Sequence, residues 1–88
     1  MYFITLLKFK KKPTKDSIAE NLKNIEMEQK DGVKLLGTYW TLGRYDAVGI
    51  YEAPNETVAM KAQVRRGDIF SAETLVAIPA EEARKLIE

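Results

Sequence analysis

The fold is decided by the stretch Tyr39-Trp40-Thr41-Leu42-Gly43-Arg44-Tyr45-Asp46-Ala47-Val48. A hydrophobic run leads into its single glycine and another leads out, which predicts two strands, Val33 to Leu42 and Arg44 to Glu52. Gly43 accepts positive φ at no steric cost, so we expect a tight hairpin at Leu42-Gly43. The aromatic and charged side chains of the stretch then lie on two neighbouring strands.

Upstream of this hairpin, the chain predicts one strand and one helix. Tyr2 to Phe9 is rich in aromatic and branched residues, as strands are. Thr14 is a suitable N-cap for a helix that Gly32 ends in a left-handed conformation. The helical spacing predicts an apolar stripe of Ile18, Leu22 and Ile25, widened by Ala19, and a polar face of Lys15, Glu20, Lys23, Glu26, Glu28 and Lys30.

Downstream, the same pattern repeats. Asn55 is an N-cap candidate for a second helix that Gly67 closes, and Ile69 to Ile78 predicts a fourth strand. Pro79 opens a short terminal helix. The order β-α-β-β-α-β predicts an α+β, ferredoxin-like fold: a four-stranded antiparallel sheet with two helices on one face and a short C-terminal helix. We expect a single domain over residues 1–88.

Composition excludes several classes of site. The 88 residues include 14 basic and 13 acidic side chains, so the net charge of +1 gives no reason to expect a nucleic-acid or membrane partner. Cysteine and histidine are both absent, which argues against thiolate catalysis, Ser-His-Asp triads and the common zinc sites. We therefore expect no cofactor and no metal. The only apolar N-terminal run is too short to span a bilayer, which favours a cytoplasmic protein.

Apolar side chains are predicted on both faces of the sheet. In the first strand Ile4 and Leu6 point one way, and Phe3, Leu7 and Phe9 the other. Two helices cover only one face, and each large side chain left exposed forgoes about 1.5–3 kcal/mol of burial. We expect a second copy of the chain to cover the other face, with a cavity near Ala47 and Gly49. The alternative is that the terminal helix folds back over it.

The chain resembles the GYD domain family. The resemblance rests on the opening stretch, on Glu52-Ala53-Pro54 after it, and on Glu73-Thr74-Leu75 further downstream. One departure is the order Gly43-Arg44-Tyr45-Asp46, in which Arg44 interrupts a literal Gly-Tyr-Asp. The resemblance implies a ferredoxin-like domain of the dimeric α/β-barrel type. It implies no single chemistry, because that wider group includes cofactor-free monooxygenases, isomerases, haem enzymes and amino-acid-sensing domains. The lack of histidine argues against a haem-binding member.

Candidate site residues come from the hairpin and its strands. Asp46 is the candidate general base, although a hydrogen bond to a nearby backbone amide or an ion pair with Arg44 is favoured for it. For ligand binding the candidates are Trp40, Arg44, Tyr45, Asp46 and Tyr51. The favoured function is a homodimeric or larger homo-oligomeric domain that binds a small molecule or regulates at the open sheet face. The alternatives are a cofactor-independent isomerase or monooxygenase-like enzyme, and a structural assembly module.

Overall fold

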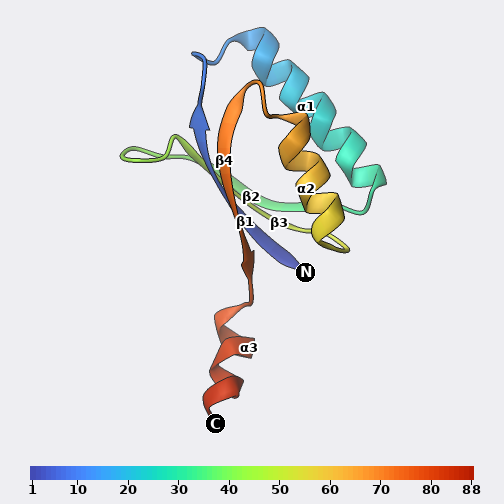
Figure 1. Ribbon diagram of the computed structural model, residues 1–88, viewed down its shortest axis with the longest axis vertical. Helices are drawn as coiled ribbons and strands as arrows, with labels where there is room; N and C mark the ends of the chain where they lie inside the picture. The colour runs from blue at the N-terminus through green and yellow to red at the C-terminus, as the bar shows by residue number, and fades with distance from the viewer.

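The computed structural model describes residues 1–88 as a four-stranded antiparallel sheet with both long helices on one side (Figure 1). The elements are β1 (Tyr2–Phe9), α1 (Lys15–Lys30), β2 (Lys34–Trp40), β3 (Ala47–Glu52), α2 (Glu56–Arg65), β4 (Phe70–Ala77), α3 (Ala80–Arg84) and the 3₁₀ turn η1 (Lys85–Ile87). The strands stand in the order β2-β3-β1-β4, which confirms the ferredoxin-like arrangement expected from the sequence.

Local side chains set the ends of the two long helices. At the start of α1 the Ser17 amide donates to the Thr14 hydroxyl at 3.1 Å, and the Thr14 amide donates to the Ser17 hydroxyl at 2.8 Å. Gly32 follows the end of α1 with a φ of 91°. At the start of α2 the Asn55 side chain accepts from the Val58 amide at 3.0 Å. The predicted caps are therefore confirmed.

The connection between β2 and β3 differs from the predicted one. Residues 41–46 form a loop, so both predicted strands extend too far into the turn. The Thr41 amide donates to the Asp46 carbonyl at 2.9 Å, and the Thr41 hydroxyl donates to the Tyr45 carbonyl at 2.7 Å. Gly43 has the expected positive φ, 111°. The prediction of a tight turn is wrong. The hydrogen bond from the Thr41 side chain to the backbone holds a wider loop where the two strands were predicted to continue pairing.

The core is small and lies at one end of the sheet. The rings of Phe3 and Tyr51 stack with their centroids 5.4 Å apart, and Ala53 and Ala59 complete the buried cluster. Only eight of the 88 residues are buried, which is few for a chain of this length. The remaining space between sheet and helices is where the cavity described below lies.

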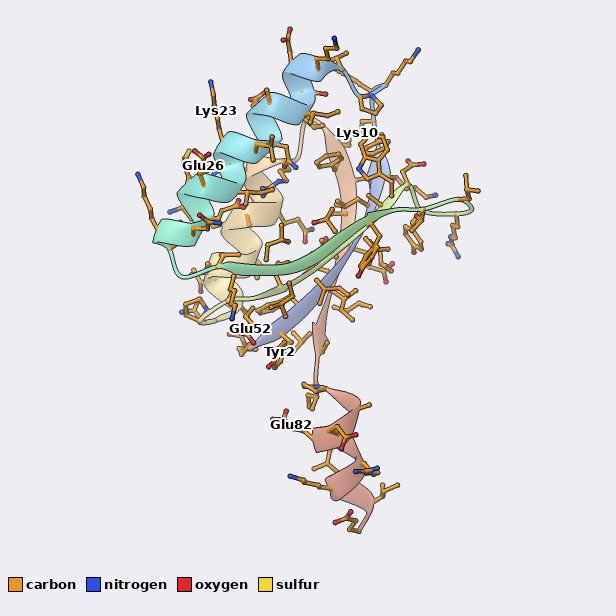
Figure 2. All side chains as sticks on the ribbon, turned by 180° about the vertical axis from the view of Figure 1, so that it is seen from behind. Tyr2, Lys10, Lys23, Glu26, Glu52 and Glu82 are labelled. Carbon is orange, nitrogen blue, oxygen red and sulfur yellow. The ribbon has the colours of Figure 1, made fainter.

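The face of helix α1 that packs on the sheet differs from the predicted apolar stripe. Ile18 and Leu22 are 43% and 57% exposed, whereas Glu28 is only 5% exposed. Lys23 and Glu26 point away from the sheet (Figure 2). The assignment of Glu28 to the polar face is therefore wrong. Its carboxylate is stable in the interior because arginines from the end of α2 donate hydrogen bonds to it.

The other face of the sheet, called here the open face, has no helix over it (Figure 1). Ile4 stands opposite Ile50 on one side and Leu75 on the other, and Leu6 stands opposite Val48. Because Phe3 and its neighbours on alternate positions face the helices, these five side chains face the opposite way. Helix α3 continues beyond the end of β4 and does not fold back over this face (Figure 1). A cover by the chain's own terminal helix is thus excluded.

Candidate functional site

A cavity of about 100 Å³ lies between the sheet and helices α1 and α2. Gly49 and Tyr51 line it, as expected for a space beside small residues, but they face the helices and not the open face where the pocket was predicted. Its volume is comparable with the ~150 Å³ of an engineered cavity that binds benzene. Besides Tyr51, the apolar part of its lining consists of Leu7, Ile25, Val33, Leu35, Ala62, Phe70 and Ala72.

Gly49 keeps the middle of the cavity floor open. A Cβ atom added there would meet the Thr5 Cγ2 methyl at 3.1 Å, closer than ordinary van der Waals contact. The glycine therefore leaves room that any other residue would occupy. Its backbone has no positive φ, so space and not conformation is the reason for glycine at this position.

One wall of the cavity is a buried ion cluster. Glu28 accepts from Arg66 at both carboxylate oxygens, at 2.6 and 2.7 Å, and from Arg65 at 3.0 Å. Arg66 also donates through Nε to the Asn21 side chain at 2.7 Å. The side chains of Glu28, Arg65 and Arg66 are 6%, 20% and 14% exposed. This bidentate geometry connects the end of α2 to α1 and leaves the cluster with one excess positive charge.

The Tyr51 hydroxyl is a polar group of the cavity lining that no neighbour in the chain satisfies. This hydroxyl makes no hydrogen bond within the chain. Every fully buried side-chain nitrogen or oxygen in the structure has a hydrogen-bond partner, so the Tyr51 hydroxyl, which has none, keeps some access to solvent. Burial raises the pKa of Tyr51, the Glu28 carboxylate raises it further, and Arg66 lowers it. The phenol is therefore neutral at physiological pH and has a hydrogen bond to offer to a molecule in the cavity.

A second polar wall is a chain of neutral side chains. The Thr5 and Thr74 hydroxyls lie 3.1 Å apart on neighbouring strands, and Thr74 donates to the Gln63 side-chain oxygen at 2.5 Å. Gln63 in turn donates to the Ala72 carbonyl at 3.4 Å. The cavity thus combines apolar walls with a few oriented hydrogen-bonding groups, which is the usual make-up of a small-molecule site.

Of the predicted site residues, only Tyr51 lines this cavity. Asp46 instead accepts a hydrogen bond from the Phe9 amide at 2.8 Å, through Oδ2, where β1 leaves the sheet. Trp40 is 63% exposed and packs edge-on against the Phe9 ring with centroids 5.4 Å apart. Both side chains hold the hairpin against β1.

Arg44 and Tyr45 lie on the other side of the sheet. The Tyr45 hydroxyl donates to Glu73 at 2.9 Å, and this carboxylate raises the pKa of Tyr45. The Arg44 guanidinium lies 5.8 Å from the centre of the Tyr45 ring. Together with Leu6, these side chains border a shallow hollow that is open to solvent. The hydroxyls of Tyr45 and Tyr51 therefore do not converge on one site.

The cavity contains residues that the sequence did not single out, above all Glu28 and Arg66. A positional signal for Glu28 was present, because it stands three residues after Ile25 and seven after Asn21, on one side of a helix. No comparable signal marks Arg66, since its partner lies 38 residues away in the chain.

The structure contains neither a membrane-spanning helix nor a metal-type cluster of side chains. No helix has the length and apolar character needed to cross a membrane. No three side chains among Asp, Glu, His and Cys come together as a metal site would need.

Comparison with known protein families identifies the family of this chain. No curated protein matches the chain. The family model of the GYD domain matches residues 3–87, which is nearly every residue of the sequence and includes every residue that lines the cavity. This chain therefore belongs to the GYD domain family.

Proposed function

We propose that this GYD domain binds a small, largely apolar molecule with one hydrogen-bonding group in the cavity beneath α1 and α2. The observation that carries the proposal is the free Tyr51 hydroxyl inside a mainly apolar space. A ligand oxygen or nitrogen next to Tyr51 would complete its hydrogen bonding, and a compact carbon skeleton would fill the space that Gly49 leaves.

Binding is favoured over catalysis because Glu28, the carboxylate that lines the cavity, is already engaged and Asp46 lies elsewhere. Glu28 is held by two guanidinium groups, and Asp46 is bonded to a backbone amide and does not line the cavity. A general base needs a free lone pair within reach of the substrate proton. The isomerase or monooxygenase alternative would therefore need Asp46 to work away from the cavity beneath α1 and α2.

We further propose that the domain functions as a homodimer or larger homo-oligomer through its open face. The side chains of Ile4, Leu6, Val48, Ile50 and Leu75 form the centre of this face, and no element of the same chain covers them. A second copy would bury them in a two-fold contact and enlarge a core that is small in the single chain.

Ligand binding is tested with phenol and toluene, which have similar size but differ in one hydroxyl. Backbone amide shifts of ¹⁵N-labelled protein are expected to report saturable binding of both at cavity residues such as Gly49. Tyr51→Phe is expected to weaken phenol binding by about 2–10-fold and to leave toluene binding unchanged. Tyr39→Phe, the same change at an exposed position, is the matched control. Shifts confined to the open face, or none that saturate, would contradict the proposal and favour a purely structural assembly module.

Self-association is tested by light scattering. Ile4→Asp places a charge in the centre of the open face and is expected to give monomers, whereas Ile18→Asp on the exposed side of α1 is expected to leave the oligomer intact. A wild-type chain that is monomeric at high micromolar concentration would refute the assembly but leave the cavity proposal standing.

A further inference from the structure

Residues 78–88, called here the C-terminal arm, project from the end of β4 away from the sheet and from α1 and α2 (Figure 1). The arm consists of Ile78, Pro79, the five-residue helix α3, the turn η1 and Glu88. Its hydrogen bonds are internal: Glu82 and Ala83 donate to the Pro79 carbonyl, and Arg84 pairs with Glu81 at 2.8 Å. Neither α3 nor η1 packs extensively on any other element of the chain.

An arm of this kind needs a surface to hold it. Isolated helices shorter than roughly 12–15 residues are marginal in water, and α3 has five. Three apolar side chains of the arm stand largely in solvent, with Ile78, Leu86 and Ile87 at 59%, 77% and 88% exposed. All three side chains are apolar, so their exposure to water does not stabilise the arm.

Each chain thus has one unsupported apolar arm and one uncovered apolar face. The arm does not pack on the open face of its own chain, because the extended backbone of Pro79 (φ −53°, ψ 140°) directs α3 away from the sheet. The arm leaves the sheet at the end where Tyr2 and Glu52, on the open-face side, also lie; Glu82 at the base of the arm is near them (Figure 2). A second copy related by a two-fold axis satisfies both surfaces at once.

We propose that the C-terminal arm of one copy packs on the open face of a second copy, with Leu86 and Ile87 directed onto the apolar side chains around Ile4 and Leu75. The lengths agree: the eight residues of α3 and η1 span about 12 Å at helical rise, and the four strands of the sheet span about 14 Å between the outermost strand axes. This inference rests on the proposed self-association and adds to it which segment makes the contact.

The direct test is an isotope-filtered nuclear Overhauser experiment on a mixture of ¹³C-labelled and unlabelled chains. Contacts between the methyl groups of Leu86 or Ile87 in one copy and those of Ile4 or Leu75 in the other are the expected result. A spectrum in which the arm methyl groups show no contacts between chains would overturn the proposal.

A variant pair gives an independent test. Leu86→Asp with Ile87→Asp is expected to raise the dimer dissociation constant by roughly 100-fold, since each dimer loses two apolar contacts from each of two arms. Arg84→Ala with Lys85→Ala lowers the net charge by the same two units and is the matched control, with no expected change. An unchanged dissociation constant for the aspartate pair, together with dissociation of Ile4→Asp, would refute the arm contact while the open-face assembly stands. Wild-type monomers would refute both.

Discussion

Arg66 binds both carboxylate oxygens of Glu28, at 2.6 and 2.7 Å, and so joins the end of α2 to the last turn of α1. This pair lies in the wall of the cavity between the sheet and helices α1 and α2. A buried charge pair adds less to stability than its short distances suggest, because both ions lose hydration. Removing one partner has a larger effect, since the other charge then stays in the interior without compensation.

Glu28→Ala is therefore expected to lower the free energy of unfolding by about 2–3 kcal/mol, somewhat less than for a fully buried pair because water reaches the arginines. Urea denaturation measures the change. Glu26→Ala, two residues away on α1 but pointing to solvent (Figure 2), is expected to shift the free energy of unfolding by less than about 0.5 kcal/mol. Equal effects of the two substitutions would mean that the ion cluster does not hold the helices.

Asp46→Ala is expected to destabilise the fold by about 1–2 kcal/mol, because the partly buried Phe9 amide loses its acceptor. Asp46→Asn keeps a side-chain oxygen that can accept the same bond, so its cost is expected to be smaller. Neither change is expected to alter phenol binding, as Asp46 does not line the cavity. If Asp46 were catalytic, the asparagine variant would fold normally but lose turnover.

Gly49→Ala is expected to destabilise the protein by about 1 kcal/mol and to weaken ligand binding, because the new methyl meets Thr5 Cγ2 at 3.1 Å and takes up cavity space. Thr5→Ser removes that methyl and keeps the hydroxyl that pairs with Thr74. In the double variant the two effects on unfolding are expected to be non-additive, with part of the stability recovered. Strict additivity in this double-mutant cycle would mean that the two side chains do not touch.

Stability is expected to fall as the pH rises above about 10, the ordinary pKa of tyrosine. Burial and Glu28 raise the pKa of Tyr51 in the folded protein, so the unfolded chain releases its phenolic proton first. The unfolded state then binds fewer protons, and the stabilisation that is fully present below pH 10 is lost as the pH approaches and passes the folded pKa. In Tyr51→Phe this loss is expected to be smaller. Unfolding free energies across the alkaline range measure it, and parallel curves for the two proteins would contradict the raised pKa.

The parts of the fold that were predictable depend on local sequence. Thr14 and Asn55 cap their helices as expected, because a cap bonds to an amide three residues away. The hairpin loop is wider than predicted, because the Thr41 hydroxyl donates to the Tyr45 carbonyl. The bond that ties this loop to β1, from the Phe9 amide to Asp46, joins residues 37 positions apart and has no local signal in the sequence. Of the candidate site residues, Tyr51 lines the cavity, whereas Trp40, Arg44, Tyr45 and Asp46 do not.

The sequence by itself determined the order of elements, the caps, the apolar character of both sheet faces and membership of the GYD domain family. Hydrophobic periodicity and capping act over a few residues, so one strand or helix is enough to reveal them. Only the tertiary structure decided that Glu28 faces inward, that the cavity lies beneath the helices, and that the C-terminal arm leaves its own sheet. Each of these depends on the partner that a side chain or segment meets in space, and for Glu28 that partner is an arginine 38 residues along the chain.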